Sequence, residues 1–151
     1  MNYAHKQYKN HTTPTTDFIN PEGAEASYIR AAAKYMRRAV AHIQAYEIQE
    51  RSDVSDKACL LLSGIVVDLE ENTPEQKKVA THLKNYFKTM IELILKMNML
   101  NDAKLAAEIA KQLDTMAQSW EDMAAKKSQL LEDISANTST LEKENPTNLG
   151  A

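Results

Sequence analysis

The sequence predicts an all-α fold, an antiparallel four-helix bundle with a flexible N-terminal arm or cap and a polar C-terminal tail. Gly (3) and Pro (4) are rare among the 151 residues, so the chain has few of the turn residues that a strand-rich fold needs. Residues of high helix propensity, such as Ala, Leu, Lys and Glu, are abundant. Apolar residues also recur at intervals of three and four along four segments, which is the spacing of one helix face.

The first helix is expected to begin at Pro21. Asn20 can cap it, and proline suits the first helical position because the N–H that it lacks would have no partner there. The apolar face of this helix consists of Tyr28, Ala32, Tyr35, Ala39, Ile43 and Tyr46. Residues 1–19 are polar and rich in Thr, Asn and His, and we interpret them as a mobile or loosely docked arm.

The second and third helices have recognisable starts. Ser52 suits the N-cap of the second helix, whose apolar stripe is Val54, Ala58, Leu61, Ile65 and Leu69. In the third helix, Thr73, Pro74 and Gln76 combine an N-cap, a proline at the first position and a capping box. The stripe of the third helix is Val79, Leu83, Phe87, Met90, Ile94 and Met97.

The fourth helix is expected to follow a break at Asn101 and Asp102, where the aspartate suits the positive end of a helix. Its stripe is Leu105, Ile109, Leu113, Met116, Trp120 and Met123, and it is expected to fade near Ile134. Four such helices with short connections pack as an antiparallel bundle. The sequence therefore predicts one helical domain over residues 20–134 and a polar tail over 135–151.

The composition and charge exclude several classes of protein. A net charge of −3 gives no overall attraction to nucleic acid or to anionic membranes. No segment has the roughly 18 uninterrupted apolar residues of a membrane span, and a single Cys cannot form an intramolecular disulfide. With no recognisable secretion signal, the expected location is cytoplasmic.

The residue patterns predict no enzyme, no catalytic residues, no cofactor and no metal site. The histidines, His5, His11, His42 and His82, are not paired at helical spacing. Cys59 lies within an apolar run, and glycine-rich phosphate loops are absent from the sequence. Phosphotransfer through His82 is an alternative, because histidine phosphotransfer modules are also four-helix bundles. However, the sequence after His82 lacks the spacing and the Gly that make room for the phosphoryl group.

The second and third helices carry more apolar residues than one stripe requires, as in the runs 58–62 and 90–95. Two explanations remain open. Both helices are buried on two sides, or an apolar groove is exposed for a partner helix. A local basic face on the first helix, formed by Arg30, Lys34, Arg37 and Arg38, is either a solvated face or a contact for an acidic partner.

Several of these residues recur with the spacing of a known family. Asn20 and Pro21 precede the run 32–39, while His82, Phe87 and Met90 lie before a turn at Asn98, Asn101 and Asp102, with Trp120 at a fixed distance beyond it. In these positions the segment from Asn20 to Met123 resembles the flagellin-specific export chaperone family, FliS.

The resemblance implies a cytosolic chaperone that binds the C-terminal segment of flagellin, prevents its premature polymerisation and presents it to the export gate. It also implies that residues 20–29 act as a hinge and cap contact. We expect partner-binding residues among core-adjacent surplus positions, namely Ile29, Leu62, Val66, Phe87, Ile91 and Met97. A monomer or weak homodimer is expected. The alternative is a self-associating four-helix structural or adaptor module without a flagellin client.

Overall fold

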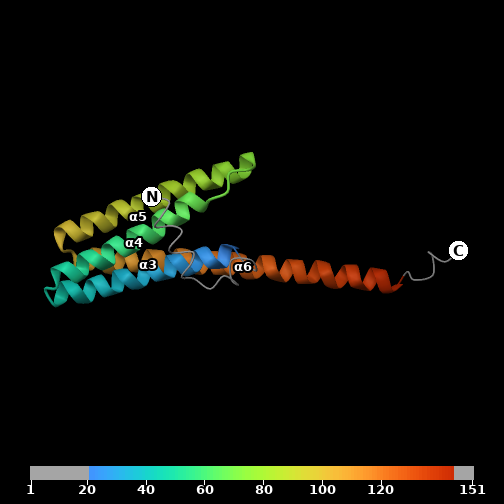
Figure 1. Cartoon of the computed structure of the whole chain (residues 1–151). Helices are drawn as coiled ribbons and strands as arrows, with labels where there is room; N and C mark the ends of the chain where they lie inside the picture. Colours follow the sequence, from blue (N-terminus) through green and yellow to red (C-terminus); the bar gives the residue numbers. More distant parts are fainter. Residues whose placement is uncertain (1–20, 145–151) are drawn as a thin grey trace.

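The computed structural model describes residues 21–144, with side chains described for residues 24–140. The helices are α3 (Pro21–Gln44), α4 (Ile48–Asp68), α5 (Pro74–Leu100) and α6 (Ala103–Glu144). Successive helices run in opposite directions, joined by short connections, and form an antiparallel four-helix bundle (Figure 1). The predicted all-α fold is confirmed. The predicted arm, residues 1–19, and residues 145–151 of the predicted tail lie outside the described residues.

The helices α3 and α6 pack against each other in an antiparallel register fixed by two ion pairs. Arg30 pairs with Glu121, and Arg37, two turns later in α3, pairs with Asp114, two turns earlier in α6. This register sets Ala33 level with Ala117. Buried alanines repeat every seven residues on the two facing sides, and we call this set the alanine seam: Ala26, Ala33, Ala110, Ala117 and Ala124. Because the distance between packed helices depends on the side chains at their contact, these methyl groups allow a close approach.

Larger side chains fill the rest of the core. The rings of Phe87 in α5 and Trp120 in α6 meet edge to face, with centroids 6.0 Å apart and planes at 80°, a geometry that contributes about 0.5–1.5 kcal/mol beyond its area burial. All four helices supply the other large buried residues, which include Ile29, Met36, Leu62, Ile65, Ile94, Met97, Ile109 and Leu113. The core is therefore continuous through the bundle.

Two predicted helix starts are confirmed. The Gln76 backbone N–H donates to Thr73 Oγ1 at 3.1 Å, and the Thr73 N–H donates to Gln76 Oε1 at 3.2 Å, which completes the capping box. Asn101 ends α5 with φ 54°, in the left-handed region. The Leu105 N–H then donates to Asp102 Oδ1 at 3.0 Å at the start of α6.

The predicted start of the second helix is wrong. The helix α4 begins at Ile48, one turn before Ser52, because the chain reverses within three residues after α3. Tyr46 takes a left-handed φ of 59°, and the Glu47 N–H donates to the His42 carbonyl at 2.8 Å. Tyr46, which was predicted on the buried face of the first helix, instead lies exposed in this turn.

The predicted fading of the fourth helix near Ile134 is also wrong, since α6 continues to Glu144. No Gly or Pro interrupts the sequence between Ala103 and Pro146. The hydroxyls of Thr138 and Thr140 donate to carbonyls one turn earlier, both at 2.9 Å, so these polar residues are accommodated within the helix. We call residues 125–144 the α6 extension; its described side chains, residues 125–140, are all exposed.

The start of α5 lies at the edge of the bundle. Val79 is exposed and Leu83 is half-buried, and the predicted stripe of this helix becomes fully buried only from Phe87 onward. In Figure 1 the α4–α5 end of the bundle diverges from the α3–α6 pair. The same periodic pattern thus has a buried and an exposed half.

We expect Ala117→Leu to destabilise the bundle, because added methylenes in the alanine seam force α3 and α6 apart. Overpacking of this kind costs about 1–3 kcal/mol. The matched control is Ala136→Leu at an exposed position of the same helix, with an expected change within about 0.5 kcal/mol. Urea unfolding followed by circular dichroism measures both, and equal stabilities for the two variants would contradict a close contact at Ala117.

Candidate functional site

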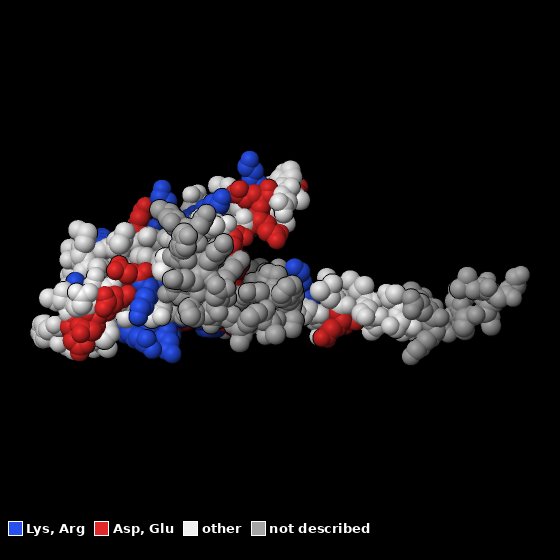
Figure 2. Space-filling view, in the orientation of Figure 1, with Lys and Arg blue, Asp and Glu red and all other residues white. Residues whose placement is uncertain are grey.

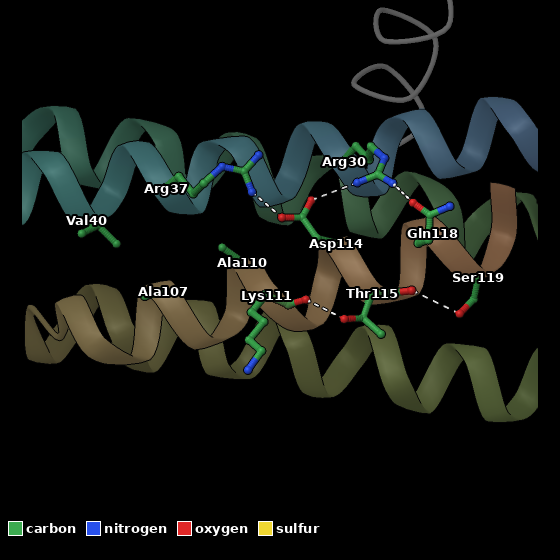
Figure 3. Close-up of a pocket in the computed structure, with 10 residues that line it drawn as sticks. All are labelled: Arg30, Arg37, Val40, Ala107, Ala110, Lys111, Asp114, Thr115, Gln118 and Ser119. Carbon is green, nitrogen blue, oxygen red and sulfur yellow. Dashed lines mark hydrogen bonds and ion pairs between the residues drawn. The ribbon is translucent and has the colours of Figure 1, made fainter. Parts of the chain in front are cut away.

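A groove of about 770 Å³ lies between α3 and α6, and we call it the α3–α6 groove (Figure 3). Its lining consists of Arg30, Arg37, Val40, Ala107, Ala110, Lys111, Asp114, Thr115, Gln118 and Ser119. Val40, Ala107 and Ala110 form an apolar end, while Arg30 and Gln118 lie at the opposite, polar end (Figure 3). The alanines leave open space that longer side chains would fill.

The polar end is organised by the guanidinium of Arg30. Its Nε donates to Glu121 Oε1 at 2.6 Å and its Nη2 donates to Glu121 Oε2 at 2.9 Å, a bidentate pair. The Nη2 group also donates to Gln118 Oε1 at 2.7 Å. The hydrogen bond from Arg30 lowers the pKa of Glu121, and the bond to Glu121 raises the pKa of Arg30. Arg30 is therefore held in one orientation across the groove.

Asp114 links both arginines of α3. It accepts from Arg37 Nη1 at 2.5 Å and from Arg30 Nη1 at 3.4 Å. The predicted basic face is consequently divided, because two of its four cations contact α6 within the bundle. Lys34 and Arg38 are exposed, and the Arg38 guanidinium lies 5.7 Å from the centre of the Tyr35 ring.

A second hollow, of about 310 Å³, lies between α5 and α6. Its lining includes Tyr86 of α5 and Met116 of α6. Burial raises the pKa of Tyr86, whose hydroxyl donates to the Gln112 carbonyl at 3.5 Å. The hollow shares three residues with the α3–α6 groove, Lys111, Thr115 and Ser119. One exposed ridge of α6 therefore has a hollow on each side, a shape that suits a helical or extended partner.

Four of the six predicted partner-binding residues lie in the core. Ile29, Leu62, Phe87 and Met97 have no exposed surface, so their interpretation as surplus positions beside the core is wrong. Each belongs to the stripe that its helix contributes to the common core.

Val66 and Ile91 are half-buried and pack against the core on α4 and α5. Neither helix lines the α3–α6 groove, so Val66 and Ile91 are not part of it.

Part of the apolar surplus predicted on the second and third helices is exposed. Large apolar side chains that the described residues leave accessible on α4 and α5 are Ile48, Leu60, Val67, Val79, Leu95, Met99 and Leu100. Burial on two sides therefore does not account for all of the surplus.

The sequence analysis identified Arg30 and Arg37 as part of a basic face, but it did not identify the residues that α6 contributes to the α3–α6 groove. Ala107, Ala110 and Gln118 carry neither a strong apolar signal nor a charge, and a hydrophobicity pattern passes over them. The seven-residue spacing of alanines along α6, from Ala103 to Ala124, is a signal that could have located this contact.

The described residues that could act as a nucleophile or as metal ligands are not arranged for either role. Burial, with a smaller effect from Asp56, raises the pKa of the half-buried Cys59 thiol to about 11, which leaves it protonated and weakly nucleophilic at neutral pH. Among the described residues no group of three or more His, Cys, Asp and Glu is placed to hold a metal ion. The described helices also include none that is long and apolar enough to cross a bilayer.

A family model described as flagellar protein FliS matches residues 1–127, well over half of the chain. No curated protein matches the sequence. The family match ends just after Ala124, the last buried residue among the described side chains of α6, so nearly all of the α6 extension lies beyond it.

The Arg30–Glu121 pair predicts a pH-dependent contribution to stability. Because the pKa of Glu121 is lowered in the folded state, the contribution is present above the unfolded-state pKa and is lost as the pH falls through the folded-state pKa. Both side chains are more than a third exposed, so we expect at most about 1 kcal/mol.

A double-mutant cycle of Arg30→Gln and Glu121→Gln, measured by urea unfolding near neutral pH and at about pH 2.5, tests this prediction. The coupling energy should be favourable at neutral pH and close to zero in acid. A coupling of the same size at both pH values would show that it does not come from the ionised carboxylate.

Proposed function

The chain belongs to the FliS family of flagellar chaperones, and we propose that it binds the C-terminal segment of flagellin in the cytoplasm. In this role it prevents premature polymerisation of flagellin and delivers it to the export apparatus. The proposed role is binding alone, with no catalytic step and no cofactor.

The α3–α6 groove is the observation that carries this proposal. Its apolar end, with Ala107 and Ala110 on α6, offers short side chains against which a client helix can approach closely. At the polar end, Arg30, Asp114 and Gln118 present donors and acceptors that can fix the orientation of the client. A disordered segment that folds on binding needs such a preformed surface, because it loses conformational entropy when it orders.

The exposed apolar side chains of α4 and α5 support a client that wraps around more than one face. An extended segment can follow separate small contacts over a large surface. We propose Val66 of α4 and Ile91 of α5 as further contacts of the client, because both are partly exposed. We call these two residues the α4–α5 edge. The four buried residues, such as Leu62, would contact a client only if the bundle opened, and they are not part of the proposed surface.

We expect a synthetic peptide of the flagellin C-terminal segment to bind the chain in a 1:1 complex. Titration calorimetry should show heat and a negative heat-capacity change, because apolar surface is buried. Ala107→Arg should weaken binding by at least about tenfold, since the cation occupies the apolar end of the groove. The matched control is Ala45→Arg, at an exposed residue of the α3–α4 turn, which should bind like the wild type.

The absence of binding heat at two temperatures would exclude the flagellin client and favour the alternative of a self-associating structural or adaptor module. Equal affinities for Ala107→Arg and Ala45→Arg, with binding intact, would place the client outside the α3–α6 groove.

A separate substitution tests the α4–α5 edge. Ile91→Lys should leave the bundle folded, because the long lysine stem can cover the same surface while its ammonium group reaches water. It should reduce peptide affinity if the client passes over this edge. Thermal unfolding and calorimetry on one preparation separate the effect on stability from the effect on binding. If the Ile91→Lys variant no longer unfolds cooperatively, Ile91 belongs to the core.

A further inference from the structure

The α6 extension projects from the bundle as a single helix (Figure 1). The helix α6 has 42 residues, compared with 24, 21 and 27 in α3, α4 and α5. Its last 20 residues reach about 30 Å at the usual helical rise. Most helices in proteins gain their stability by packing an apolar face against a partner.

The extension has such a face. Leu130, Leu131 and Ile134 within it, and Met123 two residues before it, are large apolar residues that are 53–60% exposed. The spacings of three, four and seven residues place them on one stripe. This stripe continues the one that carries Trp120 and Ala124 into the core. Within the described part of the chain, the other helices therefore bury residues of the apolar stripe of α6 as far as Ala124, and the stripe is exposed beyond it.

Charges on both sides of the stripe indicate what covers it. Lys126 and Lys127 precede Leu130 and Leu131, and Glu132 and Asp133 follow these two leucines, directly before Ile134. Lys126, Leu130 and Asp133 share one helix face, since they are four and three residues apart. Figure 2 shows basic atoms where the helix leaves the bundle and acidic atoms further along it.

This charge order favours an antiparallel copy of the same helix. When two extensions cross near Leu130, Lys126 of each copy lies level with Asp133 of the other. The segment from Lys126 to Ile134 of each copy then lies alongside the same segment of the other, and Leu130, Leu131 and Ile134 lie within this overlap. A parallel pairing would instead set lysines against lysines and carboxylates against carboxylates, which is destabilising at such spacing.

We propose that the α6 extension is a homodimerisation site, in which two copies of the chain pair their extensions antiparallel through Leu130, Leu131 and Ile134. The contact is isologous, because each copy supplies both the basic and the acidic residues. It involves about four helical turns on each side, so the dimer is expected to be weak, with micromolar dissociation. This contact lies almost wholly beyond the family match and does not depend on binding flagellin.

Sedimentation equilibrium of the full chain at about 5 to 200 μM measures the proposed association. The wild type should fit a monomer–dimer equilibrium, and Leu131→Glu should weaken it at least about tenfold. The matched control is Leu95→Glu on α5, where the leucine is exposed to a similar degree, 50% compared with 59%. The control should associate like the wild type.

A charge swap tests the orientation of the pairing. Lys126→Glu and Asp133→Lys should each weaken the dimer several-fold, because each sets like charges together. The chain that carries both substitutions should regain the wild-type dissociation constant within about twofold, since opposite charges face each other again. Circular dichroism of each variant establishes that α6 remains helical.

Three outcomes would overturn the proposal: a wild type that stays monomeric at the highest concentration, a dimer that Leu131→Glu leaves intact, and a double variant without recovery. If residues 1–20 or the flagellin segment covered the stripe instead, the wild type would be monomeric. Leu131→Glu would then lower the melting temperature or the peptide affinity. Loss of flagellin binding with the dimer intact would contradict the proposed function alone.

Discussion

Alanines repeat every seven residues on the facing sides of α3 and α6, and their methyl groups bring the two helices close together. Other features of the bundle depend on this short distance. Arg30 of α3 reaches Glu121 of α6 in a bidentate geometry, Arg37 reaches Asp114, and Phe87 of α5 meets Trp120 within the same core. Beside this contact, the exposed Ala107 and the buried Ala110 line a groove with short side chains.

The chemistry of this surface suits recognition better than reaction. Arg30, Arg37 and Asp114 of the groove are already paired across the helices, and the thiol of Cys59 on α4 is held in its protonated form. A groove with paired charges at one end and methyl groups at the other can orient a helical segment with little loss of solvation, because the charges keep their partners. Membership of a flagellar chaperone family agrees with such a surface.

Local signals in the sequence were sufficient for the fold class and for two helix starts. The capping box at Thr73 and the break at Asn101 depend only on neighbouring residues, so they could be predicted. The start of α4 depends on the turn at Tyr46. Its left-handed backbone could not be predicted, because tyrosine rarely adopts this conformation. Periodicity identified the apolar face of each helix, but it could not say which neighbour covers it. Periodicity therefore does not distinguish the buried Leu62 from the exposed Val79.

The single tryptophan of the chain has a further consequence. Trp120 is 5% exposed, packs against Phe87 and lies one turn before Ala124, where α6 leaves the bundle. Its indole therefore lies at the junction between the packed and the projecting parts of the helix, where its fluorescence can report on local structure. Its fluorescence follows the polarity around the ring, and no second tryptophan contributes to the signal. Opening of this end of the bundle can therefore be followed in the unlabelled protein.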